Sequence, residues 1–152
     1  MGLCWHEACA YCAWLSAQTA QTYRLATEHE WEAAARGQAS RSYAYDGQFD
    51  AAKGNIPETR LKRTTPIGVF PDGDTPDGIS DLKGNSVDWT SSPGAGYASQ
   101  VWWVVRGGCW LGVQSDTHIA GRGRYAPDFR NFGIGFRVVC VSPSGDPPTP
   151  RS

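Results

Sequence analysis

The side chains of this 152-residue chain that could hold a soft metal ion belong to five cysteines and three histidines. Cys9 and Cys12 have C-x-x-C spacing, which on a helix places both sulfur atoms on one face. A structural zinc ion needs two more ligands, and no second C-x-x-C motif follows. A thioredoxin-like role needs a strand–helix–strand context, which the sequence around the pair lacks. We therefore expect both cysteines to pack in the core as small apolar residues.

The acidic residues between Asp72 and Asp77 superficially resemble the start of a calcium-binding loop. The third acid comes one position late for an EF-hand. The twelfth position is Lys83, where an EF-hand needs a glutamate. The spacing excludes an EF-hand.

Two helices are predicted near the start of the chain. Residues 4–17 carry apolar side chains on one helical face. These side chains are Trp5, Ala8, Cys9, Cys12 and Leu15. Thr27 and Glu30 have the spacing of a capping box, so a second helix begins after Thr27. Gly37 ends this helix at about Arg36.

Residues 38–100 are rich in turn-forming residues and show no helical period, so any strands there must be short. Such a long irregular stretch needs aromatic anchors, buried polar pairs or a metal ion to fix it. Val101–Arg106 and Gly135–Val141 are predicted strands. We expect one domain over residues 1–141 and a disordered, proline-rich tail over residues 142–152.

Composition narrows the class of protein. Charged residues make up 19% of the chain and the net charge is −1, which argues against a disordered chain and a nucleic-acid binder. No apolar run approaches the length of a membrane span, and no signal peptide is visible. The odd number of cysteines argues against a disulfide framework and favours a reducing compartment. We expect cytoplasmic synthesis, with display on a virion or cell surface through a partner left open.

Several motifs follow one another between residues 3 and 140. They are residues 4–16 (CWHEACAYCAWLS), 23–37 (YRLATEHEWEAAARG), 65–68 (TPIG), 81–90 (DLKGNSVDWT), 106–110 (RGGCW) and 135–137 (GFR). In this order they resemble the formylglycine-generating-enzyme, or sulfatase-modifying factor, family. The resemblance implies an α+β fold of the C-type lectin-like type, with two helices, short antiparallel strands and much irregular loop. The strands that precede the first helix in the family are missing here, which leaves the partner of the C-terminal strand open.

The enzymes of this family imply metal ligands that this chain lacks. The oxidases use two cysteines after the RGGSW-like motif to hold copper, which prefers soft thiolates. Here Cys109 replaces the serine of that motif, and residues 110–139 contain no cysteine. No copper is therefore expected. A second enzymatic branch uses three histidines to hold iron, but His6 and His29 fall on exposed helix positions and we do not expect them to meet His118.

Calcium is a further implication of the family resemblance. One family site uses an Asn and a Glu, which correspond to Asn85 and Asp88. A second uses an asparagine with a neighbouring carbonyl, which corresponds to Asn55 and the carbonyl of Ile56. The shorter Asp88 weakens the case for bidentate binding, and the alternative is that these side chains only hydrogen-bond loop backbone.

The segment from Arg106 to Arg137 alternates framework-like residues with chemically unrelated ones that show no hydrophobic period. This spacing resembles the variable region of diversity-generating-retroelement proteins on the same fold. The resemblance implies a ligand-binding surface carried by the unrelated residues. These are Leu111, Gly112, Val113, Asp116, Gly121, Gly123, Tyr125, Ala126, Phe129, Asn131, Phe132 and Gly133, with His118 as a polar neighbour.

The sequence thus favours a non-catalytic recognition protein with a hypervariable surface over about residues 106–137. Its partner would be a macromolecule, a protein or a cell-surface component, and not a nucleic acid. Aromatic anchors beside small residues suit such a surface. The alternatives left open are an oxidase of the family and a degenerate member without either function.

Overall fold

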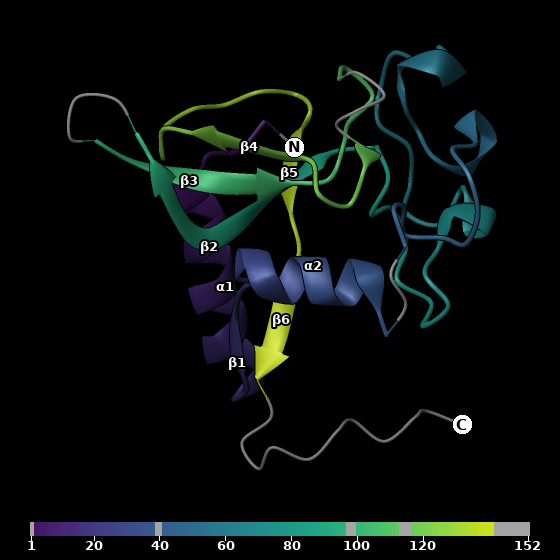
Figure 1. The fold of residues 1–152 in the computed structure, drawn as a ribbon. Helices are drawn as coiled ribbons and strands as arrows, with labels where there is room; N and C mark the ends of the chain where they lie inside the picture. Colours follow the sequence, from purple (N-terminus) through teal and green to yellow (C-terminus); the bar gives the residue numbers. More distant parts are fainter. Residues whose placement is uncertain (1, 39–40, 97–99, 113–116, 142–152) are drawn as a thin grey trace.

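The computed structural model describes residues 2–38, 41–96, 100–112 and 117–141 (Figure 1). Two α-helices and six strands lie within these residues. They are α1 (Trp5–Thr19), β1 (Thr22–Leu25), α2 (Glu28–Arg36), β2 (Val87–Ala95), β3 (Val101–Arg106), β4 (Arg122–Tyr125), β5 (Ile134–Phe136) and β6 (Val138–Val141). Three single 3-10 turns interrupt the irregular stretch, at Ala51–Lys53, Pro57–Thr59 and Pro71–Gly73. In this part of the chain no helix is both long and apolar enough to cross a bilayer.

The strands form two sheets. The larger has the order β4-β3-β2-β5, and the smaller pairs β1 with β6 in antiparallel fashion. One pair differs from the antiparallel expectation, because β2 and β5 run parallel. The predicted strand Gly135–Val141 is wrong as a single element: the chain leaves β5 at Phe136 and enters β6 at Val138. Arg137 lies at this switch and donates from Nε to Asp88 Oδ2 at 2.6 Å.

Helix α2 begins with the cap expected from its local sequence. In α2 the hydroxyl of Thr27 accepts from the Glu30 N–H at 3.1 Å, and the Thr27 N–H donates to Glu30 Oε2 at 2.8 Å. Gly37 ends α2 with a φ of 57°, in the left-handed region that favours glycine. The prediction of both helices is confirmed, with α1 beginning one residue later and ending two residues later than expected.

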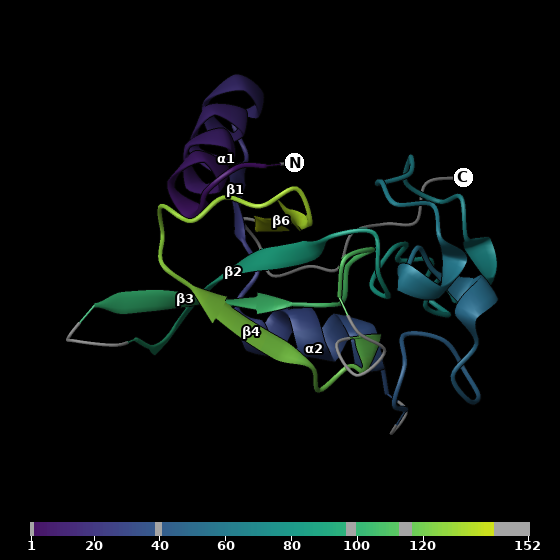
Figure 2. The ribbon, with the colours of Figure 1, turned by 90° about the horizontal axis from the view of Figure 1, so that it is seen from above.

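Helix α2 packs against β2 and β3 of the larger sheet, whereas α1 packs against β1 of the smaller sheet (Figure 2). On the α1 side the core consists of Ala8, Cys12, Leu25, Trp89, Val105 and Ile134. On the α2 side it consists of Ala26, Trp31, Ala35, Ala44, Leu82 and Ile119. Cys12 is buried and Cys9 packs against the first group, as expected. Burial raises the pKa of Cys9 to about 11, so its thiol stays protonated at neutral pH.

The irregular stretch is anchored by a buried lysine. The Lys83 ammonium donates to the Tyr45 hydroxyl at 2.7 Å and to the carbonyl of Asp50. It also lies 5.6, 4.9 and 4.1 Å from the ring centres of Tyr43, Tyr45 and Phe49. Cation–π contacts of this kind stabilise a desolvated ammonium. The aromatic anchors and buried polar pairs that the sequence required are therefore present here.

Candidate ligand-binding site

A cavity of about 290 Å³ opens beside the larger sheet, within the segment that the sequence singled out. All four strands of that sheet contribute to it. Among the described residues, its lining comprises Val87, Val105, Gly107, Cys109, Leu111, Gly112, Arg122, Gly123, Tyr125, Asn131, Gly133 and Ile134. Regular strands therefore supply one part of the wall, and the loops around residues 107–112 and 131–133 supply the rest.

Six of the predicted site residues meet at this cavity. They are Leu111, Gly112, Gly123, Tyr125, Asn131 and Gly133. Phe129 joins them through a stack on Tyr125, with ring centres 4.6 Å apart and an interplanar angle of 9°. Phe132 is 79% exposed, on the same loop as Asn131 and Gly133. We call Leu111, Phe129 and Phe132, which are 51%, 38% and 79% exposed, the rim surface.

Other predicted residues lie apart from the cavity. The ring of His118 packs edge-on against Tyr43 with centres 5.5 Å apart, and its Nδ1 accepts from the Ala120 N–H at 3.2 Å. Gly121 belongs to the same turn, since its N–H donates to the His118 carbonyl at 2.7 Å. Ala126 lines a separate hollow next to His6 and Pro127. Val113 and Asp116 lie outside the described residues.

Sequence reasoning missed the apolar part of the wall. The candidate ligand-binding residues did not include Val87, Val105 or Ile134, yet all three line the cavity. Val105 and Ile134 are buried core residues as well. Val105 could have been included, because it lies in the predicted strand Val101–Arg106, which leads directly into the candidate segment. Val87 carried no such signal, since its strand was not predicted.

Tyr125 is part of both the cavity and the core. Its ring lies edge-on to Trp89, with centres 6.3 Å apart, and it packs against the core on the α1 side. A residue with these contacts is less interchangeable than Phe132, which is mostly exposed.

Two glycines at the cavity have little room for a side chain. A Cβ atom at Gly133 would lie 3.0 Å from Cys109 Sγ, and one at Gly123 would lie 3.1 Å from Val105 Cγ2. Both distances are shorter than ordinary van der Waals contact. A larger residue at either position requires Cys109 or Val105 to shift, and it would fill the cavity.

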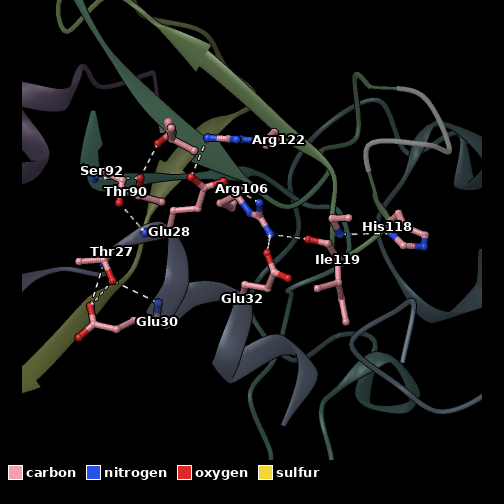
Figure 3. Close-up of polar contacts among 12 residues, drawn as sticks. Thr27, Glu28, Glu30, Glu32, Thr90, Ser92, Arg106, His118, Ile119 and Arg122 are labelled. Atoms are coloured by element: carbon pink, nitrogen blue, oxygen red, sulfur yellow. Dashed lines mark hydrogen bonds and ion pairs between the residues drawn. The ribbon is translucent and has the colours of Figure 1, made fainter. Parts of the chain in front are cut away.

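A buried arginine fixes the strands that carry the cavity (Figure 3). Arg106 donates from Nη1 to Glu28 Oε1 at 2.8 Å. Its Nη2 donates to Glu32 Oε2 at 2.7 Å and to the carbonyl of Ile119 at 2.6 Å. The second oxygen of Glu28 accepts from Arg122 Nη2 at 2.7 Å. The Glu28 carboxylate of α2 therefore binds an arginine from β3 and another from β4. These ion pairs hold in place the two strands that form one edge of the sheet beside the cavity.

The asparagines predicted for calcium lie together, but their oxygen atoms are engaged. Asn85 Oδ1 accepts from Asn55 Nδ2 at 3.3 Å and from the Thr65 N–H at 3.0 Å. The Ile56 carbonyl accepts from the Thr59 hydroxyl at 2.7 Å and from its N–H at 3.1 Å. N–H and O–H donors therefore point at the atoms that would have to face a cation.

Asp88 lies in a different environment from the two asparagines. Its Oδ2 accepts from Arg137 Nε at 2.6 Å and from Trp31 Nε1 at 2.9 Å. The guanidinium supplies the positive charge that this buried carboxylate needs. Calcium prefers six to eight oxygen ligands, and these four residues do not fit it in this arrangement. These contacts argue against the calcium site implied by the family resemblance, and a melting experiment tests it below.

No group of three or more His, Cys, Asp or Glu side chains that could hold a metal ion occurs among the described residues. Cys109 is half-buried at the cavity, and no second cysteine is among the described residues of the lining.

The fold and this site define a member of a known family. Residues 1–141 match the sulfatase-modifying factor enzyme 1-like domain, and the chain belongs to this family.

Relatives within the family have diverse names. The chain is 33% identical over 162 residues to the inactive C-alpha-formylglycine-generating enzyme 2 of Bos taurus, a match that covers 95% of the chain and 50% of that protein. It is 30% identical over 155 residues to the serine/threonine-protein kinase pkn1 of Chlamydia caviae, covering 91% of the chain and 23% of the kinase. The chain thus spans half or less of the length of these two relatives.

Solved structures show the same fold. Treponema denticola variable protein 1 superposes with a TM-score of 0.82 at 20% identity, over 91% of this chain and 69% of that one. The P3c variant of the major tropism determinant superposes with a TM-score of 0.64 at 17% identity, over 90% of this chain and 37% of that one. The α+β fold of the family is therefore present here.

Proposed function

We propose that this chain is a non-catalytic recognition protein that binds a macromolecular partner through the cavity and its rim surface. The observation that carries the proposal is the combination at one site of a preformed cavity with three exposed apolar side chains, Leu111, Phe129 and Phe132. Apolar anchors of this kind around a pocket dominate binding energy at protein interfaces.

The support beneath the site favours binding by a rigid surface. Arg106 and Glu28 link α2 to β3, and Arg122 and Glu28 link α2 to β4. A partner therefore meets side chains whose backbone is already ordered, which lowers the entropic cost of association. The fold shared with Treponema denticola variable protein 1 supports the proposal, as does the spacing of the segment between Arg106 and Arg137.

A selection experiment tests binding at this surface. A random 12-residue peptide library displayed on phage is selected on the immobilised chain, and the enriched peptides are measured against variants. We expect Phe132→Ala to weaken binding at least tenfold. Ile67→Ala is the matched control, because Ile67 is 83% exposed and lies outside the cavity lining and the rim surface. Equal binding by both variants, or no enriched peptide, overturns the proposal.

The finer hypothesis of a hypervariable surface has its own test in flanking DNA. If the surface is hypervariable, the DNA downstream of the coding sequence should contain a near-copy of the codons for residues 106–137. This copy should have adenines at the variable positions and lie next to a reverse-transcriptase gene. If the neighbouring DNA carries no such copy, the surface is a fixed binding site and the diversification hypothesis is wrong.

A further inference from the structure

The strand β4 forms one edge of the larger sheet. It pairs with β3 through the register Val104 to Arg124 and Val105 to Gly123, and the described part of the chain places no strand along its other side. An edge strand presents backbone N–H and C=O groups that can pair with another extended chain. Figure 2 shows β4 beside β3 at the margin of the sheet, and β5 lies at the other end of the strand order.

Alternate residues of β4 point to opposite faces of the sheet. On one face Gly123 and Tyr125 line the cavity of the candidate site, together with the apolar side chains of Val87, Val105 and Ile134. Arg122, at the start of the strand, borders this cavity as well as the one on the other face. Since Gly123 has no side chain, the cavity reaches the strand itself. An apolar side chain from a neighbouring strand would find its contacts on this face.

The other face of β4 is basic. A second cavity of about 400 Å³ is lined by Arg122 and Arg124 together with Pro93, Gly94, Ala95, Val104 and Gly123. Arg124 is exposed and has no hydrogen bond or ion pair with any described residue. The side chain of Arg122 is 57% exposed and forms an ion pair with Glu28. Among the five arginines within residues 101–137, four form ion pairs with carboxylates of the described residues, and Arg124 is left as the uncompensated positive charge on this face.

We propose that the edge of β4 binds an extended peptide in which apolar and acidic residues alternate. The peptide's backbone pairs with the outer edge of β4, a mode known as β-augmentation. Its apolar side chains enter the cavity beside Gly123 and Tyr125. Its acidic side chains reach Arg122 and Arg124 on the opposite face, where a guanidinium binds a carboxylate in bidentate fashion. This inference rests on the proposed function and names the ligand chemistry of the same site.

Matched synthetic peptides test the inference by fluorescence anisotropy. The first probe is labelled Gly-Glu-Leu-Glu-Val-Glu-Gly. The second has the same composition in blocks, Gly-Glu-Glu-Glu-Leu-Val-Gly. The third exchanges each glutamate for lysine, and the fourth repeats the first with N-methyl groups on alternate backbone nitrogens. We expect the first peptide to bind at least tenfold more tightly than the second and third, and at least fivefold more tightly than the fourth.

Variants of the protein test the same inference from the side of the binding surface. Arg124→Glu should weaken binding of the alternating acidic peptide at least tenfold and strengthen binding of the lysine peptide. Arg60→Glu is the matched control, because Arg60 is also exposed and lies outside both cavities. Equal affinity for the alternating and blocked peptides, or no response to Arg124→Glu, overturns the inference. The inference would also be overturned if a phosphorylated peptide or a nucleic acid bound to this surface and the alternating acidic peptide did not.

The outcome separates this inference from the proposed function. Enriched library peptides that depend on Phe132 but lack acidic–apolar alternation would leave the recognition function standing and make the edge-strand inference wrong. Failure of both the library selection and the peptide probes would make both wrong.

Discussion

Glu7 and Arg130 form an ion pair that joins the first turn of α1 to the loop carrying Phe129 and Phe132. The same oxygen of Glu7 accepts from the Cys4 N–H at 2.9 Å, so one carboxylate both caps the helix and holds the loop. A loop without regular secondary structure is thus anchored to a helix terminus, which fixes the rim surface in place.

The Glu7 carboxylate should make stability depend on pH in acid. The hydrogen bond from Arg130, followed by that from the Cys4 N–H, lowers the pKa of Glu7 from 4.5 to about 2. Because the folded pKa lies below the unfolded one, the stabilisation is complete above pH 4.5 and is lost as the pH falls through 2. In Glu7→Gln we expect a smaller drop of the urea midpoint between pH 6 and pH 3. Glu58→Gln, at an exposed position without an ion pair among the described residues, should behave like the parent. Identical drops in parent and Glu7→Gln would contradict this role.

Loss of Arg106 should be among the most damaging single changes. Its side chain is 2% exposed and pairs with Glu28 and Glu32. Arg106→Ala leaves these carboxylates and the Ile119 carbonyl without their cation, so we expect a cost of about 3–5 kcal/mol in the free energy of unfolding. Arg124→Ala, an exposed arginine with no such pairs, should change it by about 0.5 kcal/mol or less. Urea denaturation measures both, and a cost below about 1 kcal/mol for Arg106→Ala contradicts the network.

The helices could be predicted because their signals are local. The capping box at Thr27 and the stop at Gly37 specify α2 within ten residues of sequence. The family motifs could be recognised for the same reason, since motifs such as residues 106–110 are contiguous. The same contiguous motifs contain Arg24, Arg36, Arg106 and Arg137, and each of these arginines donates to a carboxylate.

The strands β1, β2 and β4 could not be predicted because their pairing is long-range. β2 pairs with β5 about 47 residues later, and the Pro93 and Gly94 within it look like turn residues in isolation. The Lys83 anchor was invisible for a similar reason. Its aromatic partners Tyr43, Tyr45 and Phe49 precede it by more than thirty residues, and a lysine is not expected to be buried without such a site.

The buried Lys83 should make the protein more stable in mild alkali. Burial lowers the pKa of Lys83 from 10.5 to about 8. Between these values the unfolded chain binds more protons at this residue than the folded one, so the free energy of unfolding gains a contribution that rises with pH. Burial raises the pKa of Tyr45, which acts in the opposite direction above about pH 10.

The measurement compares urea midpoints at pH 7.5 and 9.5 in the parent and in Lys83→Met. We expect the difference between the two proteins to move in favour of the parent as the pH rises. Lys62→Met, which removes the ammonium of an exposed lysine, should retain the parent's pH dependence. A pH dependence that Lys83→Met leaves unchanged would show that Lys83 does not titrate in this range.

Calcium should have little effect on thermal stability. Asp88 is paired with Arg137, and Asn85 Oδ1 accepts two N–H donors, so a cation would have to displace existing contacts. A ligand that binds only the folded state stabilises it by an amount that grows with the logarithm of its concentration relative to the dissociation constant. We expect the melting temperature to differ by less than about 1 °C between 5 mM calcium and 5 mM EDTA. A rise of several degrees that Asn85→Ala abolishes would instead establish the calcium site implied by the family resemblance.

Among the aromatic residues of the candidate site, Phe132 should matter for binding and Tyr125 for stability. Phe132 is 79% exposed, so Phe132→Ala should change the free energy of unfolding by about 0.5 kcal/mol or less while weakening ligand binding. Tyr125 is half-buried between Phe129 and Trp89, so Tyr125→Ala should cost about 1–3 kcal/mol through lost packing. Thermal and urea unfolding of both variants measures the contrast. Equal destabilisation would mean that Phe132 also packs in the interior, and the rim surface would then lose its most exposed anchor.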